Sequence, residues 1–126
     1  MPCACGLASV LVLVLPQAGG AVAGPAVRTA DQRQALIDLA HVLGQAHALH
    51  RVCAGPADDT WRARMEKLLE VEAPAEALKA QLADSFNAGY ASGGAEAKDC
   101  KTAAAAEARA ARQGAELARR LSAGTP

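Results

Sequence analysis

Apolar residues recur at steps of three and four through the stretch 31–53, which predicts a long amphipathic helix. Thr29 and Gln32 stand at its start as in a capping box, in which the hydroxyl accepts from an early backbone N–H and the amide side chain reaches back. Gly55 and Pro56 should end the helix, because glycine suits the position after the last turn and proline cannot continue it. The apolar stripe comprises Leu36, Leu39, Leu43, Ala46, His50 and Cys53.

Two further amphipathic segments follow the first helix. Asp58 and Asp59 place negative charge where a helix N-terminus favours it, and the helix that they open should end near Glu72. Pro74 then stands in the first turn of a third helix, where proline is tolerated. Gly89 would allow another backbone to approach this third helix closely. The stripes are Trp61, Met65, Leu68 and Leu69 in the second helix and Leu78, Leu82, Phe86 and Tyr90 in the third.

Gly93 and Gly94 form the clearest predicted break, and the alanine-rich segment 95–121 after them favours a fourth helix. Small side chains dominate its inward seam, so this helix can approach the first one closely. No stretch alternates as a strand does. The predicted fold is therefore all-α, a small bundle of about four helices. The seam consists of Cys100, Ala103, Glu107, Ala110, Gly114, Leu117 and Leu121.

Residues 1–23 are typical of a signal peptide. The apolar run 7–15 is too short to cross a bilayer, which needs about 20 residues. Ala21 and Ala23 give the small-x-small pattern of a cleavage site, so we expect cleavage after about Ala23 and export to the periplasm. The predicted organisation is a signal peptide at 1–23, a tether at 24–28, one helical domain at 29–122 and a disordered tail at 123–126.

The predicted export determines which cysteines the mature protein keeps and whether they can form a disulfide. Hydrophobic residues make up 52% of the chain, but many are alanines, so burial alone should leave a modest stability margin. Cys3 and Cys5 would leave with the leader, whereas Cys53 and Cys100 would enter an oxidising compartment. We predict that these two form a disulfide, which for a loop of about 48 residues is worth about 4 kcal/mol in the chain-entropy model. The alternative is two separate buried thiols.

The first helix carries a weak candidate for metal binding. His47 and His50 lie three residues apart, and two imidazoles on adjoining turns could hold a soft divalent metal. The alternative is that each histidine packs between helices or is partly exposed.

Polar residues in the second and third helices are also open to two interpretations. Arg62 and Glu66 could form a charged site or an ordinary solvated face with a salt bridge. Phe86, Asn87 and Tyr90 could line a site or form a polar patch beside a core aromatic, with Asn87 bonded to a neighbouring loop.

No catalytic constellation is recognisable in the sequence. The motifs GxSxG, GxxxxGK, GxGxxG and HExxH are lacking, and with Cys53 in a disulfide no cysteine remains as a nucleophile. We therefore expect neither an enzyme nor a cofactor. Thirteen basic and thirteen acidic residues cancel, which argues against nucleic acid or an anionic membrane surface as an obligate partner. No membrane span is expected after cleavage.

Taken in order, several short motifs resemble a family of small exported proteobacterial, specifically alphaproteobacterial, proteins of unknown function. The pattern is LGxxHxL and a cysteine, then WRxxM, LL, EAP, FNxGY and a second cysteine. His50 and Ala97 depart from it, since arginine and an aromatic are usual there. The resemblance implies a periplasmic two-cysteine helical domain and carries no activity. Its motif residues include Gly44, His47, Trp61, Arg62, Met65, Phe86, Asn87, Gly89 and Tyr90.

These observations favour a non-enzymatic periplasmic protein that binds another periplasmic protein or an envelope component. A small acid-stress chaperone is a second hypothesis, because such chaperones are similarly short, helical and disulfide-linked, and histidines titrate as the pH falls. A weak metal-binding protein using His47 and His50 is the third. An enzyme whose site the sequence does not reveal is the fourth.

Overall fold

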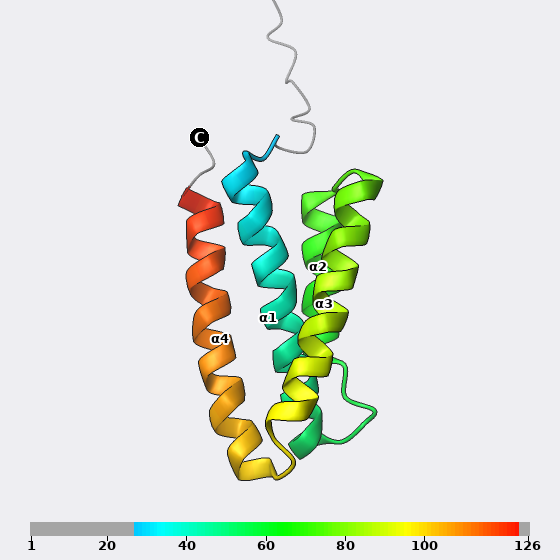
Figure 1. Cartoon of the computed structure of the whole chain (residues 1–126), viewed down its shortest axis with the longest axis vertical. Coiled ribbons are helices and arrows are strands. Elements are labelled where there is room, and N and C mark those ends of the chain that lie inside the picture. Colours follow the sequence, from blue (N-terminus) through cyan, green and yellow to red (C-terminus); the bar gives the residue numbers. More distant parts are fainter. Residues whose placement is uncertain (1–26, 124–126) are drawn as a thin grey trace, which may run out of the picture.

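The computed structural model describes residues 27–123 as four helices (Figure 1). They are α1 (Ala30–Ala54), α2 (Thr60–Glu72), α3 (Glu76–Glu96) and α4 (Cys100–Ala123). The all-α class, with about four helices and one disulfide, is confirmed. The predicted leader at 1–23 and the last three residues of the predicted tail lie outside the described residues. Within 27–123, no helix combines the length and the apolar character needed to cross a bilayer.

Helix α1 is the centre of the bundle. In Figure 1 it runs between α4 on one side and α3 on the other, with α2 behind α3. Residues 42–44 and 46–49 are all buried, and consecutive buried positions mean that every face of the helix is covered. The backbones of α2, α3 and α4 each approach α1, while α2 keeps its distance from both α3 and α4. The main core consists of Leu36, Leu39, Ala40, Val42, Leu43, Ala46, Trp61, Met65, Leu82, Ala110, Leu117 and Leu121.

The helix starts use the capping groups that the sequence offers. The Thr29 hydroxyl accepts from the backbone N–H of Gln32, and the Gln32 amide oxygen accepts from the backbone N–H of Thr29 at 2.9 Å, so the predicted capping box is confirmed. At the start of α2, the Asp58 carboxylate accepts from the backbone N–H of Thr60 at 3.0 Å. Asp99 accepts from the backbone N–H of Thr102 at 2.9 Å and caps α4 in the same way.

Glycines bring α1 and α3 into backbone contact. A Cβ atom placed on Gly44 of α1 would lie 2.9 Å from the backbone nitrogen of Tyr90 and nearer still to the carbonyl oxygen of Phe86. A Cβ on Gly89 of α3 would lie 2.7 Å from the carbonyl carbon of His41 and nearer still to its oxygen. Only hydrogen atoms fit between the two helices at these crossing points. The close approach predicted for Gly89 is therefore present, and Gly44 provides its counterpart on α1.

The predicted break at Gly93 and Gly94 is wrong. Both glycines lie inside α3, which continues to Glu96, and the turn into α4 is formed by residues 97–99. The reason is packing, because a Cβ on Gly93 would lie 2.6 Å from the carbonyl oxygen of Gln45. Gly93 thus serves a helix–helix contact and not a chain reversal. As a consequence α4 begins at Cys100, five residues later than the sequence pattern indicated.

The start of α3 also differs from the prediction. Pro74 lies before α3, which begins at Glu76, and not within its first turn. Ala73 takes the left-handed conformation at the end of α2, with φ of 42°. The reversal between α2 and α3 is therefore made by a left-handed residue followed by proline, so the helix starts after both.

A covalent link closes one end of the bundle and an ion pair closes the other. The predicted disulfide joins Cys53 to Cys100, with 4.8 Å between their Cα atoms, beside a small apolar cluster around Leu49. At the opposite end, the Arg28 guanidinium donates to both carboxylate oxygens of Glu72, at 2.7 and 3.1 Å, and to the carbonyl oxygen of Leu121 at 2.9 Å. Both ends of α4 are therefore tied to the rest of the domain.

Substituting Gly89 by alanine should destabilise the fold. The new Cβ meets the His41 backbone, which cannot rotate away, so α1 and α3 must separate, at a cost of about 1–3 kcal/mol typical of overpacking. Urea unfolding followed by circular dichroism measures this loss. The matched control is Gly94→Ala in the same helix, where no atom lies within 4 Å of the added Cβ and alanine should add roughly 0.5–1 kcal/mol. Equal stabilisation by both changes would contradict the contact.

Candidate functional site

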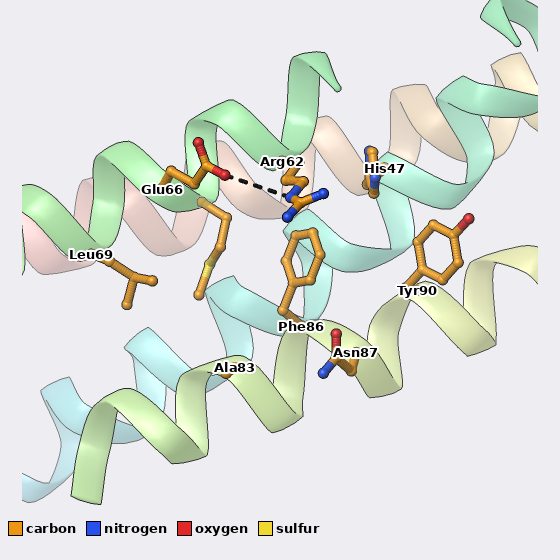
Figure 2. Close-up of a pocket in the computed structure, with 9 residues that line it drawn as sticks. His47, Arg62, Glu66, Leu69, Ala83, Phe86, Asn87 and Tyr90 are labelled. Carbon is orange, nitrogen blue, oxygen red and sulfur yellow. Dashed lines mark ion pairs between the residues drawn. The ribbon is translucent and has the colours of Figure 1, made fainter. Parts of the chain in front are cut away.

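A groove of about 480 Å³ lies between α2 and α3, with α1 behind it (Figure 2). Helix α2 contributes two polar and two apolar side chains, and α3 contributes two aromatic residues, an amide and an alanine. Because α2 does not pack against the backbone of α3, the space between them stays open at the surface. We call this the His47 groove. It is lined by His47, Arg62, Met65, Glu66, Leu69, Ala83, Phe86, Asn87 and Tyr90.

His47 is the buried polar residue of the groove. Its side chain comes from α1 and is 6% exposed. The ring centroid lies 5.8 Å from that of Phe86 and 5.3 Å from that of Tyr90, so two α3 aromatics enclose the imidazole. Atom Nδ1 is buried and has no hydrogen-bond partner among the described residues. His47 therefore carries the cost of burial without the compensating hydrogen bond that buried polar groups usually have.

The surroundings of His47 favour the neutral imidazole. Burial lowers its pKa first, and the positive charges of Arg51 and Arg62 lower the pKa further. Asp58 and Asp59 act in the opposite direction with smaller effects. At neutral pH the groove thus presents an uncharged ring, which can donate one hydrogen bond and accept another.

The mouth of the groove carries two opposite charges. Arg62 Nε lies 3.5 Å from Glu66 Oε1 one turn along α2, and both side chains are about two-thirds exposed, at 66% and 68%. An exposed pair of this kind contributes little to stability, so both groups remain able to turn toward a ligand. Figure 2 shows Arg62 above Phe86, with Asn87 on α3 facing the same space.

Arg51 fixes one end of the groove. Its Nη1 donates to the Tyr90 hydroxyl at 2.6 Å, and its Nη2 donates to the carbonyl oxygen of Pro56 in the loop before α2. The guanidinium also lies 5.7 Å from the centroid of the Tyr90 ring. Arg51 therefore holds Tyr90 of α3 and the α1–α2 loop in one arrangement. Its Nε is a second buried nitrogen without a partner in the described part of the chain.

Glu107 of α4 contacts side chains of both α1 and α2. Its Oε1 accepts from the indole Nε1 of Trp61 at 2.8 Å and lies 2.8 Å from Nδ1 of His50. The other ring nitrogen of His50 lies 3.5 Å from Asp58 Oδ1. A single carboxylate therefore links α4 to both α1 and α2, and it orients the tryptophan on which α2 packs.

The structure brings together most of the motif residues that the sequence singled out. His47, Arg62, Met65, Phe86, Asn87 and Tyr90 all line the groove. Gly44 and Gly89 do not line it but set the α1–α3 contact behind it. Trp61 faces a different groove, between α2 and α4.

Sequence reasoning missed the roles of Arg51 and Glu107. Arg51 stands four residues after His47, so helical spacing alone places the two side chains on the same face. Glu107 was placed on the inward seam of α4, where a carboxylate among alanines requires a donor. Trp61 was the available indole donor. Ala83, by contrast, gives no sequence signal.

The two candidate metal ligands have different surroundings. His50 has a carboxylate beside each ring nitrogen, at 2.8 and 3.5 Å, whereas His47 is enclosed by aromatic rings. Across residues 27–123, no group of three or more histidine, cysteine, aspartate or glutamate side chains is placed to hold a metal ion. The chemistry that the His47 groove offers is accordingly recognition by a neutral imidazole, an amide, a mobile ion pair and an apolar wall.

Protonation of His47 should destabilise the fold. Its pKa is lowered on folding, so the unfolded chain binds the proton more readily and stability falls as the pH drops below the ordinary histidine value of about 6.5. Urea unfolding from about pH 7 to about pH 5 should show this decline, and His47→Phe should reduce it. The other titratable groups are the same in both proteins, so the test is the difference between their two pH profiles. An identical slope in both would contradict the assignment.

Comparison with known proteins places the chain in a family. The segment 32–124 matches the family model described as "Protein of unknown function (DUF2385)". This segment contains both walls of the His47 groove and both cysteines of the disulfide. No curated protein and no solved structure matches the chain. The predicted resemblance to a family of unknown function is confirmed at this level, while the motif pattern and the bacterial lineage stay predictions. Because the match covers most of its length, the chain belongs to the DUF2385 family of proteins of unknown function.

Proposed function

We propose that the protein is an exported, non-enzymatic binding protein whose ligand occupies the His47 groove. The observation that carries the proposal is the buried imidazole, 6% exposed, with Nδ1 unpartnered in the described chain. A buried polar atom without a partner costs about 1–3 kcal/mol. Such a group beside an open groove, with its pKa shifted by burial, is typical of a binding site.

The size and lining of the groove indicate a compact ligand. Its volume of about 480 Å³ lies within the range of roughly 300–1,000 Å³ usual for small-molecule sites. Met65, Leu69 and Phe86 supply an apolar wall, and Asn87 supplies an amide. A ligand with a flat apolar body and one hydrogen-bonding end, or a side chain of a partner protein with these features, fits this lining.

The same lining supports binding over catalysis. Among residues 27–123, no serine, threonine or cysteine lines the groove, and the one carboxylate in that lining, Glu66, is paired with Arg62. The neutral His47 ring lies beside Phe86 and Tyr90, and the Tyr90 hydroxyl accepts a hydrogen bond from Arg51. General base catalysis needs the base within hydrogen-bond reach of the group that it deprotonates.

Two features support export. The leader pattern at 1–23 precedes the folded domain, and the family match begins only at residue 32, beyond the predicted cleavage point. The Cys53–Cys100 disulfide suits an oxidising compartment such as the periplasm. Neither feature depends on the groove, so export and binding are tested separately.

A fragment screen followed by two-dimensional NMR tests the binding role. We expect small aromatic acids and amides to shift the backbone signals of Met65, Phe86 and Asn87, because these residues line the groove. The variant Ala83→Trp fills the groove from an exposed position on α3 and should abolish the shifts. Ala88→Trp places the same side chain at an exposed α3 position outside the groove and should leave them intact.

The screen has a clear negative outcome. Shifts scattered over the surface, or shifts that survive Ala83→Trp, would show that the groove is not the site. Circular dichroism of both tryptophan variants checks that the helices are retained, so that loss of binding is not loss of fold.

N-terminal sequencing of protein recovered from the periplasm tests export. We expect a mature chain beginning at Gly24, because small residues at Ala21 and Ala23 precede that bond. Recovery of the protein only from the cytoplasm, or with Met1 still present, would contradict the predicted cleavage.

A further inference from the structure

A second groove lies on the other side of α2, between α2 and α4. Its volume is about 420 Å³, and its floor is formed by α1. It exists for the same reason as the His47 groove, because α2 packs its backbone closely only against α1. We call it the α2–α4 groove. It is lined by Leu39, Leu43, Trp61, Arg64, Lys67, Leu68, Val71, Ala111, Gly114, Ala115 and Ala118.

The charges of this groove are all of one sign. Within the described part of the chain, Arg64 and Lys67 are the only ionisable residues in the lining, and both are basic, whereas basic and acidic residues balance over the whole chain. The Arg64 guanidinium lies 4.2 Å from the centroid of the Trp61 ring, a cation–π contact that holds it at the groove. Lys67 pairs with Glu70 at 3.4 Å, but both side chains are mostly exposed, so the pair is weak.

The opposite wall offers no polar side chain. Helix α4 contributes three alanines and Gly114 to the lining, and their wall from Ala111 to Ala118 is about 10 Å long at 1.5 Å per residue. The floor and the α2 wall add Leu43, Leu68 and Val71, of which Val71 is 66% exposed. The groove is thus apolar along its length, with positive charge on one rim only.

We propose that the α2–α4 groove binds a free, single-chain anionic amphiphile, with its acyl chain along the apolar floor and its acidic head at Arg64 and Lys67. Charge complementarity selects the anionic head, since no carboxylate from residues 27–123 lines the groove. The small volume selects one chain and a free molecule, because a groove of this size matches small ligands. This site is independent of the His47 groove, which has its own polar set on the opposite flank of α2.

Calorimetric titration of the purified, disulfide-bonded protein with sodium laurate, below its micellar concentration, tests the proposal. We expect saturable binding at one site. Dodecyltrimethylammonium has a chain of the same length and the opposite head charge, and it should bind at least tenfold more weakly. Equal binding of the two amphiphiles would overturn the proposal, because the site would then recognise only the alkyl chain and not the charge of the head group.

Charge reversal on α2 locates the head group. The double variant Arg64→Glu/Lys67→Glu should weaken laurate binding at least tenfold. Arg62→Glu is the matched control, since it reverses a charge on the same helix but at the His47 groove. All three side chains are on the solvent side of α2, so the fold should tolerate each change. Weakening by Arg62→Glu and not by the double variant would overturn the assignment.

Variants that fill the groove test where the acyl chain of the ligand lies. Ala115 is exposed and lines the groove, so Ala115→Trp should abolish laurate binding, whereas Ala105→Trp, at an exposed α4 position outside the lining, should not change it. Vesicles of phosphatidylglycerol test whether the groove binds a membrane surface and not a free molecule. Binding to these vesicles without saturable binding of free laurate would overturn the proposal in favour of a membrane surface.

Discussion

The backbone contact between α1 and α3 is the constraint on which the rest of the structure depends. Gly44 and Gly89 each face the backbone of the other helix so closely that no Cβ fits. This contact fixes the register of α3 on α1. Because Phe86 and Tyr90 flank Gly89 on α3, the register decides where their rings lie, and it sets them 5.8 and 5.3 Å from the ring of His47. The enclosure of the imidazole is therefore a consequence of two glycines.

The position of α2 follows from a different kind of interaction. Helix α2 has no glycine contact with α1, and it is held by the apolar side chains of Trp61 and Met65 and by the hydrogen bond from Trp61 to Glu107. Side-chain packing keeps helix axes about 8–10 Å apart, and here it holds α2 away from both α3 and α4. A groove results on each flank. The polar side chains of one α2 flank and the basic rim of the other then give the two grooves different chemistry.

Local signals in the sequence were enough to predict the helices and the covalent link. Thr29 with Gln32 gave the first helix start, and Cys53 with Cys100 gave the disulfide. Gly93 and Gly94 were misread because a glycine that breaks a helix and one that lets a neighbouring helix approach look alike in a single sequence. Only the carbonyl oxygen of Gln45, far away in the chain, distinguishes the two cases.

The candidate site was harder to predict because it depends on gaps between helices. The sequence singled out His47 as a weak metal-ligand candidate or a packing residue, and Phe86 and Asn87 as a possible site or a polar patch. It did not join them into one lining. Periodicity assigns a residue to a face, and it does not tell how far two helices stand apart. The free space beside His47 depends on how far α2 lies from α3, and α2 is held by Trp61, Met65 and the hydrogen bond from Trp61 to Glu107 of the last helix. No pattern within α2 or α3 contains that information.

The stability of this small domain gives the unpartnered imidazole its significance. Domains of this size are stable by about 5–15 kcal/mol, and the alanines of α4 bury little area. A penalty of about 1–3 kcal/mol at His47 is then a sizeable fraction of the total, comparable with the roughly 4 kcal/mol that a loop closed by Cys53 and Cys100 supplies. A phenylalanine at position 47 would have no unpartnered polar atom and would not carry that penalty. The presence of a histidine, with Arg62 and Asn87 at the same opening, therefore accords with the binding role that we propose for the groove.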